Sequence, residues 1–287
     1  VKHLEDLING ILKTGTKAKD FEFSFEGHPN NTTRAHLQAL YDLGFRRVSY
    51  GVQDYNETVQ KAIHRIQPFE HVEQVTQWAR EIGYSSISHD LVFGLPFQNL
   101  DDVLNTINQT NRLRPDRLAF YSYAHVPWLK PGQRKYSEKD LPADSYKRSL
   151  YEAGKELFIA ANYSDIGMDH FALSTDEMVK ARDNGGLHRN FMGYTVQKTG
   201  MLLGLGVSSI SDIYYGFAQN KKTIHEYYDE VANNKLAVAK GYFLNDEDEA
   251  MRQYILNISS ISFLISHKRN NCLNCSLLFI EIGRAHV

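Results

Sequence analysis

Four strand-like runs in the first half of this chain end in groups that could carry chemistry. Glu26, Gln53 and Asp90 each close one run, and the step Tyr123-Ala124-His125 closes a fourth. Any one of these side chains could simply hydrogen-bond its own loop backbone. Because neighbouring strands of a parallel sheet lie about 4.8 Å apart, residues in the same phase on successive strands could line one mouth. The recurrence therefore favours a shared active site over isolated loop contacts.

The elements that position these residues repeat one pattern. A helix stops at glycine plus an aromatic residue, at Gly44-Phe45 and again at Gly83-Tyr84, and a strand follows at once. Glycine just past a helix end adopts the left-handed conformation that closes the helix. A repeated helix–glycine–strand unit is typical of a (β/α) barrel, whose chemistry lies at the carboxyl ends of its strands. We therefore predict an α/β fold, a partial (β/α) barrel with a parallel sheet and outer helices.

Periodicity places the individual elements. Alternation of phenylalanines with polar residues predicts the first strand, and apolar residues at helical spacing predict the helices. We expect strands at Phe21–Glu26, Arg47–Val52, Ser86–Phe93, Arg117–Tyr123 and Tyr163–Met168. Thr32 and Thr33 can cap the first helix between these strands. Further helices are expected at Phe69–Ile82, from Leu100 to Ile107, and at Ser145–Ala161.

Composition narrows the class of protein. The 287 residues suffice for one barrel-sized domain, with 42% hydrophobic and 23% charged residues. A formal net charge of −2 gives no electrostatic case for nucleic acid or an anionic membrane. No run approaches the roughly 20 apolar residues of a membrane span, and no signal peptide stands at the start. We expect a cytoplasmic protein without membrane or nucleic-acid partners.

The carboxyl-terminal sequence has a different character. Residues 259–287 contain one acid, Glu281, follow no consistent period and end in a run typical of a translated sequencing adapter. We interpret 259–287 as a non-native or artefactual tail and 1–258 as the barrel core with the start of a carboxyl-terminal region. The only cysteines, Cys272 and Cys275, lie in this tail and cannot complete a four-ligand zinc site. We therefore assign no metal ligand in this chain.

Six stretches together resemble the oxygen-independent coproporphyrinogen III oxidases, radical S-adenosylmethionine (SAM) enzymes of haem biosynthesis. The resemblance runs from about Phe21 to about Asn257, with the stretches in the family's order and at similar spacing. They are GFRRVSYGVQDYN (44–56), DLVFGLP (90–96), PDRLAFYSYAH (115–125), GMDHFA (167–172), LHRNFMGY (187–194) and LGLGVSSIS (203–211). The resemblance implies a radical SAM barrel.

The resemblance also implies cofactors and a reaction. A 4Fe–4S cluster would cleave SAM to a 5′-deoxyadenosyl radical, which takes a hydrogen from a propionate of coproporphyrinogen III. Loss of CO2 and one electron leaves a vinyl group, and two such steps give protoporphyrinogen IX. Of two bound SAM molecules, the first would contact Glu26 and Ile210. The second would contact Gln53, Arg65, Asp90 and Ala124. Carboxylates and an amide suit ribose hydroxyls and an ammonium group, and arginine suits a carboxylate.

The chain departs from the family pattern in two places. The family's C-x-x-x-C-x-x-C cluster loop is expected upstream of Val1, and Met192 stands where the family commonly has glutamine. We therefore expect an internal fragment that is itself inactive.

Further expectations concern partners and substrate. Arg189, between His188 and the aromatic Phe191, is our candidate for holding one propionate of the tetrapyrrole substrate. The alternative is that Arg189 only fixes its own loop through backbone carbonyls. We also expect an electron donor for the cluster, and a monomer.

Two other functions remain open from the sequence. One is a haem- or tetrapyrrole-binding chaperone on the same barrel, which product analysis would distinguish from the oxidase. The other is a metal-dependent barrel hydrolase using Asp169, His170 and His188, which would require stoichiometric zinc or manganese.

Overall fold

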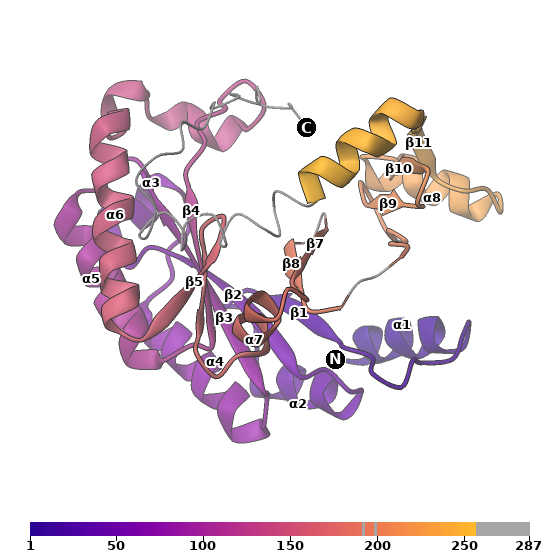
Figure 1. The fold of residues 1–287 in the computed structure, drawn as a ribbon, viewed down its shortest axis with the longest axis horizontal. Coiled ribbons are helices and arrows are strands. Elements are labelled where there is room, and N and C mark those ends of the chain that lie inside the picture. The colour runs from indigo at the N-terminus through magenta and orange to yellow at the C-terminus, as the bar shows by residue number, and fades with distance from the viewer. Residues whose placement is uncertain (191–192, 198–199, 257–287) are drawn as a thin grey trace. The chain divides into compact units, whose positions relative to one another are not determined.

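The structure is a computed structural model, and it describes residues 1–190, 193–197 and 200–256 (Figure 1). The chain divides into two compact units, Val1–Lys180 and Ala181–Val287, and each is treated by itself below. The predicted boundary between 258 and 259 falls outside the described residues and stays a prediction.

The first unit is built on one six-stranded sheet with the order β1-β2-β3-β4-β6-β5. Four neighbouring strands are parallel, as predicted: β1 (Ser24–Gly27), β2 (Arg47–Gln53), β3 (Ser86–Phe93) and β4 (Arg117–Ser122). The first begins later than expected, because Phe21 and Glu22 precede the paired segment.

The far edge of this sheet differs from the expected pattern. β5 (Tyr163–Gly167) does not pair with β4; instead β6 (His170–Leu173) lies between them, antiparallel to both. The turn between β5 and β6 uses Met168 and Asp169 at φ values of 42° and 68°. Non-glycine residues seldom adopt these values, so the sequence gives no signal for this hairpin.

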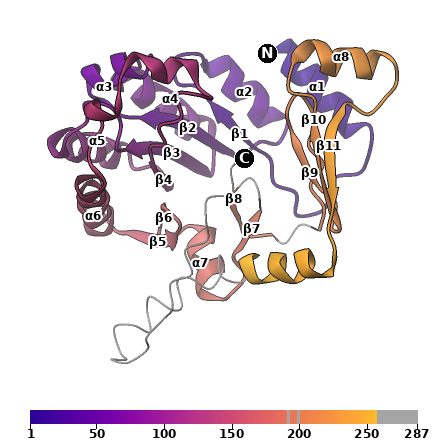
Figure 2. The same ribbon diagram turned by 90° about the horizontal axis from the view of Figure 1, so that it is seen from above.

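Helices cover the sheet. They are α1 (Lys2–Leu12), α2 (Arg34–Asp42), α3 (Glu57–Ala62), α4 (Phe69–Ile82), α5 (Leu100–Leu113) and α6 (Asp144–Ala160). Side-chain caps mark where α2, α3 and α5 begin. Thr33 caps α2, and Asn99 caps α5 by accepting a hydrogen bond from the Asp102 amide. α4 ends at Gly83, which has a φ of 108°, as the sequence predicts. Figure 2 shows these helices around the strands of the first unit.

The two faces of the parallel strands have opposite characters. Val48, Tyr50 and Val52 of β2 are buried, as are the residues of β3 in the matching phase, including His89. They form the core against the helices: Tyr50 packs with residues of α2 and α4, and Leu91 with residues of α5 and α6. The residues in between on β2 and β3, including Ser49 and Asp90, are only partly buried. One face of the sheet is thus a hydrophobic core and the other a polar surface.

The second unit is smaller and antiparallel. β7 (His188–Asn190) pairs with β8 (Gly193–Thr195), and β9 (Ile210–Asp212), β10 (Gly216–Asn220) and β11 (Val238–Phe243) form a three-stranded sheet. α8 (Ile224–Ala232) joins β10 to β11, and α7 (Glu177–Asp183) crosses from the first unit into the second. Residues 246–256 are helical. Within the described residues, no helix is long and apolar enough to cross a bilayer.

Candidate cofactor-binding site

The polar face of the parallel sheet brings two of the predicted carboxylates into one row. Glu26 on β1 pairs with Ser49 on β2, and Asp90 on β3 pairs with Gly51, two residues further along β2. The Ser49 hydroxyl donates to Asp90 Oδ1 at 3.2 Å, and the Glu26 charge acts on Asp90. Glu26 and Asp90 therefore lie on one face of the sheet, although Asp90 lies within β3 and not, as the sequence predicts, at its end.

Asp90 is the strongly perturbed acid of this surface. Burial, together with the charge of the neighbouring Glu26, raises the pKa of its carboxyl to about 6. The hydroxyl of Ser49 and the guanidinium of Arg65 oppose that rise because both favour the ionised form. A carboxylate held close to the point of ionisation at neutral pH is a candidate for ligand binding.

Gly51 leaves the space into which two further predicted side chains reach. A Cβ atom at this position would lie 2.7 Å from Gln53 Nε2 and 2.9 Å from Arg65 Nη2. Arg65 Nη2 also donates to the Gly51 carbonyl at 2.7 Å, and Arg65 Nε is buried without a partner. Gln53, Arg65 and Asp90 thus converge around one glycine, with a donor still unsatisfied.

A backbone irregularity aims Gln53 at this space. The pairing of β2 with β3 shifts register between Gly51 and Gln53, and Gln53 has a φ of 68°. Such bulges occur next to active sites, where they redirect a side chain. Neither the shift nor the positive φ could be anticipated from the sequence.

Ala124 follows β4, the strand next to β3, and is exposed. Its carbonyl accepts a hydrogen bond from Gln133 Nε2 at 3.2 Å, and Gln133 Oε1 accepts one from the Val126 amide at 2.5 Å. The loop after β4 is therefore folded back onto the strand end. This restraint fixes the backbone at Ala124. A residue with so small and apolar a side chain could contact a ligand through its backbone.

Ile210 and Arg189 belong to the second unit. Ile210 opens β9, and the Gly204 Cβ position would lie 2.6 Å from its carbonyl oxygen, so the glycine-rich loop packs on this backbone. Arg189 lies on β7 with its guanidinium carbon 5.0 Å from the centre of the Tyr194 ring, and its buried Nη1 has no partner. Met192 and Phe191 lie outside the described residues.

His170, one of the residues considered for metal binding, contacts other groups of the first unit. His170 Nε2 lies 3.3 Å from Tyr121 Oη, and His170 Nδ1 lies 2.8 Å from the Met168 carbonyl, so both ring nitrogens are engaged. Among the residues the structure describes, no group of three or more histidine, cysteine, aspartate or glutamate side chains could hold a metal ion.

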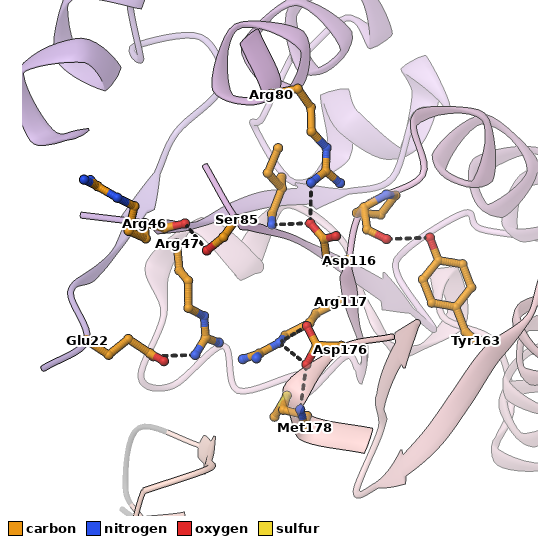
Figure 3. A network of polar contacts seen from close by, with 12 residues as sticks. Glu22, Arg46, Arg47, Arg80, Ser85, Asp116, Arg117, Tyr163, Asp176 and Met178 are labelled. Carbon is orange, nitrogen blue, oxygen red and sulfur yellow. Dashed lines mark hydrogen bonds and ion pairs between the residues drawn. The ribbon is translucent and has the colours of Figure 1, made fainter. Parts of the chain in front are cut away.

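The other end of the parallel strands carries a second polar network, which the sequence reading missed (Figure 3). Asp116 accepts from Arg80 at 2.6 Å and from the Ile87 amide at 2.7 Å. Arg117 Nε lies 3.0 and 2.9 Å from the two carboxylate oxygens of Asp176. A salt bridge also joins Arg47 to Glu22. In barrels of this kind the amino ends of the strands serve stability, and this network ties them together.

Comparison with known proteins shows what this chain is similar to. The family model described as the radical SAM superfamily matches residues 2–110. The chain carries a radical SAM domain. This finding confirms the predicted radical SAM barrel, and the residues converging around Gly51 lie within the matched range.

This chain has curated relatives whose names are more specific than the description of the family model. It is 43% identical over 243 residues to the oxygen-independent coproporphyrinogen III oxidase of Helicobacter pylori, covering 85% of this chain and 53% of the relative. Identity to the enzyme of the same name from Synechocystis is 40% over 255 residues, or 89% of this chain and 55% of the relative. The chain thus spans about half the length of these curated relatives.

A solved structure shows the same fold. Coproporphyrinogen III oxidase (HemN) from Escherichia coli, described as a radical SAM enzyme, matches with a TM-score of 0.84 and 37% identity. The match covers 90% of this radical SAM chain and 59% of that one.

Proposed function

We propose that this chain is the SAM-binding barrel of an oxygen-independent coproporphyrinogen III oxidase. The similarity to relatives of that name supports this, and the convergence of Gln53, Arg65 and Asp90 around Gly51 is the structural observation that carries it. The names of these relatives favour the oxidase over the tetrapyrrole chaperone. The proposed reaction turns two propionates of coproporphyrinogen III into vinyl groups, giving protoporphyrinogen IX.

The polar face fits SAM as a ligand. SAM carries a carboxylate, an ammonium group and ribose hydroxyls, and when bound it would supply the 5′-deoxyadenosyl group of radical chemistry. Arg65 would pair with the carboxylate of one SAM molecule, since its Nε lacks a partner. Asp90 and Gln53 would bind its polar groups beside it, with Ala124 contributing from the end of β4. Glu26 and Ile210 would contact a second SAM molecule.

The iron–sulfur cluster does not fit the described residues. A 4Fe–4S cluster is normally held by cysteine thiolates, and the residues that the structure describes include no cysteine. We therefore assign no described residue of this chain a role in a reaction step that involves the cluster.

The proposed chemistry sets demands on the substrate site. Each converted propionate loses CO2, one hydrogen atom and one electron, so an electron acceptor is needed. Coproporphyrinogen III has four propionates, and their charges need cations. Arg189 is our proposed propionate ligand, because its buried Nη1 has no hydrogen-bond partner among the residues that the structure describes. We further propose a monomeric, cytoplasmic enzyme served by an electron donor.

Two experiments test this function. Isothermal titration calorimetry should show that the Val1–Val287 chain binds SAM, and absence of binding would contradict the assigned site. Anaerobic incubation of a full-length protein carrying this segment with coproporphyrinogen III, SAM and a reductant should give protoporphyrinogen. Tetrapyrrole bound without conversion would support the chaperone instead.

A further inference from the structure

Asp54 is a buried acid that the SAM contacts proposed above leave unused. It directly follows Gln53, its exposed fraction is 0%, and burial raises the pKa of its carboxyl to about 6. Its Oδ2 accepts from Gln98 Nε2 at 2.6 Å, and its Oδ1 accepts from the Asn56 amide at 2.5 Å. Removing a carboxylate from water costs free energy, so a fully buried one needs compensating interactions.

Gln98 carries the effect of Asp54 to the end of β3. Gln98 Oε1 accepts from the amides of Gly94 and Leu95 at 2.7 and 3.2 Å, and its Nε2 also donates to the Val92 carbonyl at 3.0 Å. This one side chain therefore holds the turn that follows Phe93, the last residue of the strand that carries Asp90. The Asp54–Gln98 bond joins that turn to the end of β2 across 44 residues of sequence.

A second glutamine extends the same network to the loop of Arg65. Gln60 Nε2 donates to the Asp54 carbonyl at 2.9 Å and to the Gln67 carbonyl at 2.7 Å. Gln60 Oε1 accepts from the Gln67 amide at 2.8 Å, and Gln67 Nε2 donates to the Gly51 carbonyl at 3.2 Å. The segment between Gln60 and Gln67 contains Arg65, so its position also depends on the network around Asp54.

These bonds explain how Gln53 keeps its unusual backbone. A positive φ at a residue other than glycine costs on the order of 1–3 kcal/mol and persists only where the surroundings enforce it. Gln53 has a φ of 68° and its neighbour Asp54 is bonded through both carboxylate oxygens and its carbonyl. The strained residue is thus held from the position that follows it.

We infer that Asp54 is a positioning residue for SAM binding: its carboxylate through Gln98, and its backbone carbonyl through Gln60, fix the three segments that carry Gln53, Arg65 and Asp90. This inference rests on the proposed function, because it assumes that these three residues bind SAM. Asp54 itself is buried beneath the site and is not proposed to touch the ligand.

The substitution Asp54→Asn tests the inference with almost no change in volume. The asparagine could still accept from the Asn56 amide, but its NH2 group would then face the NH2 group of Gln98. Rotating the Gln98 amide would place its NH2 group against the amides of Gly94 and Leu95. No arrangement of the two amides satisfies every donor, so the connection between β2 and β3 should break.

The experiment measures SAM affinity by calorimetry and the melting temperature of the Val1–Val287 chain, each for wild type, Asp54→Asn, Gln98→Met and the control Asp116→Asn. Asp116 is also a hydrogen-bonded acid on this sheet but lies at the opposite end of the strands. We expect both Asp54→Asn and Gln98→Met to weaken SAM binding about tenfold in the folded protein. Asp116→Asn should lower the melting temperature without changing SAM affinity.

The outcomes separate this inference from the proposed function. If wild-type chain does not bind SAM, the proposed site itself is wrong. If wild type binds and Asp90→Asn weakens binding, but folded Asp54→Asn and Gln98→Met bind SAM as wild type does, the positioning role of Asp54 is overturned and the function stands. If Asp54→Asn fails to fold, Gln98→Met decides alone, since it removes the same bond without touching the buried charge.

Discussion

At the scale of single residues, the perturbed acids set the behaviour of the proposed site. Asp90 titrates at about 6 because it is buried, and Asp54 does so for the same reason. Their pKa values in the unfolded chain are near 3.8. Between those values the folded state binds more protons than the unfolded state, so these two carboxyls contribute stability as the pH falls. Acidification should therefore weaken ligand binding, whereas protonation of these two carboxyls does not destabilise the fold.

We predict that SAM affinity of the chain falls several-fold between pH 7 and pH 5, because protonated Asp90 can no longer accept hydrogen bonds from the ligand as a carboxylate. The groups facing Asp90 are Ser49, Glu26 and Arg65. Calorimetry across this range provides the measurement. In Asp90→Asn the affinity should be lower at pH 7 and its dependence on pH much weaker, and an unchanged pH profile in this variant would contradict the prediction.

The charge of Asp90 should matter for binding and little for folding. Because a charge-assisted hydrogen bond contributes about 1.5–3 kcal/mol, Asp90→Ala or Glu26→Ala should weaken SAM binding roughly tenfold to a hundredfold. Paired measurements of SAM affinity and melting temperature check this. A large loss of melting temperature with unchanged affinity in the folded protein would show that these acids serve the fold.

At the scale of elements, glycines divide into those that serve the site and those that serve the core. Gly51→Ala should push the ends of Gln53 and Arg65 away, because its Cβ would lie within 3 Å of both. Flexible side chains can move, so we expect SAM affinity to fall with little change in stability.

Gly154 of α6 is the matched control for Gly51. A Cβ there would lie 2.5 Å from Phe120 Cε1 and 2.9 Å from Ile107 Cδ1, in the core of the first unit. Gly154→Ala should therefore destabilise the fold by about 1–3 kcal/mol, as overpacking does, and leave SAM affinity unchanged. Urea unfolding and calorimetry on both variants give the comparison, and the same pattern of change in both would refute the distinction.

The sequence predicts those elements whose cause is local. Strand alternation and glycine caps are read within a few residues, and accordingly the predicted ranges of α4 and β3 agree with the structure. The row of Glu26 and Asp90 follows from strand phase alone. The bulge at Gln53, the β5–β6 hairpin and the Asp54–Gln98 bond could not be predicted, because they depend on contacts between distant segments or on strained backbone. The roles of Ile210 and Ala124 came from family resemblance and remain proposals.

At the scale of the whole molecule, the chain consists of a barrel portion and a second unit. Together they span about half the length of the relatives. Residues 259–287 follow no helical or strand period in the sequence. We therefore predict that deleting 259–287 leaves the melting temperature of the chain nearly unchanged. Differential scanning calorimetry of the two chains would decide, and a loss of several degrees would show that the segment packs against the rest.

The buried His89 has a consequence for how acid unfolds this protein. It lies in the core with Nε2 3.0 Å from Thr76 Oγ1, and burial lowers the pKa of its imidazole to about 3. In the unfolded chain the same ring binds a proton near pH 6.5. From pH 6.5 down to about 3, unfolding thus takes up a proton at His89, whereas it releases protons from Asp54 and Asp90 only between about pH 6 and 3.8. Replacing His89 by a residue that cannot be protonated would remove this proton uptake. The variant should then unfold at a lower pH than the wild type, provided that the core still packs.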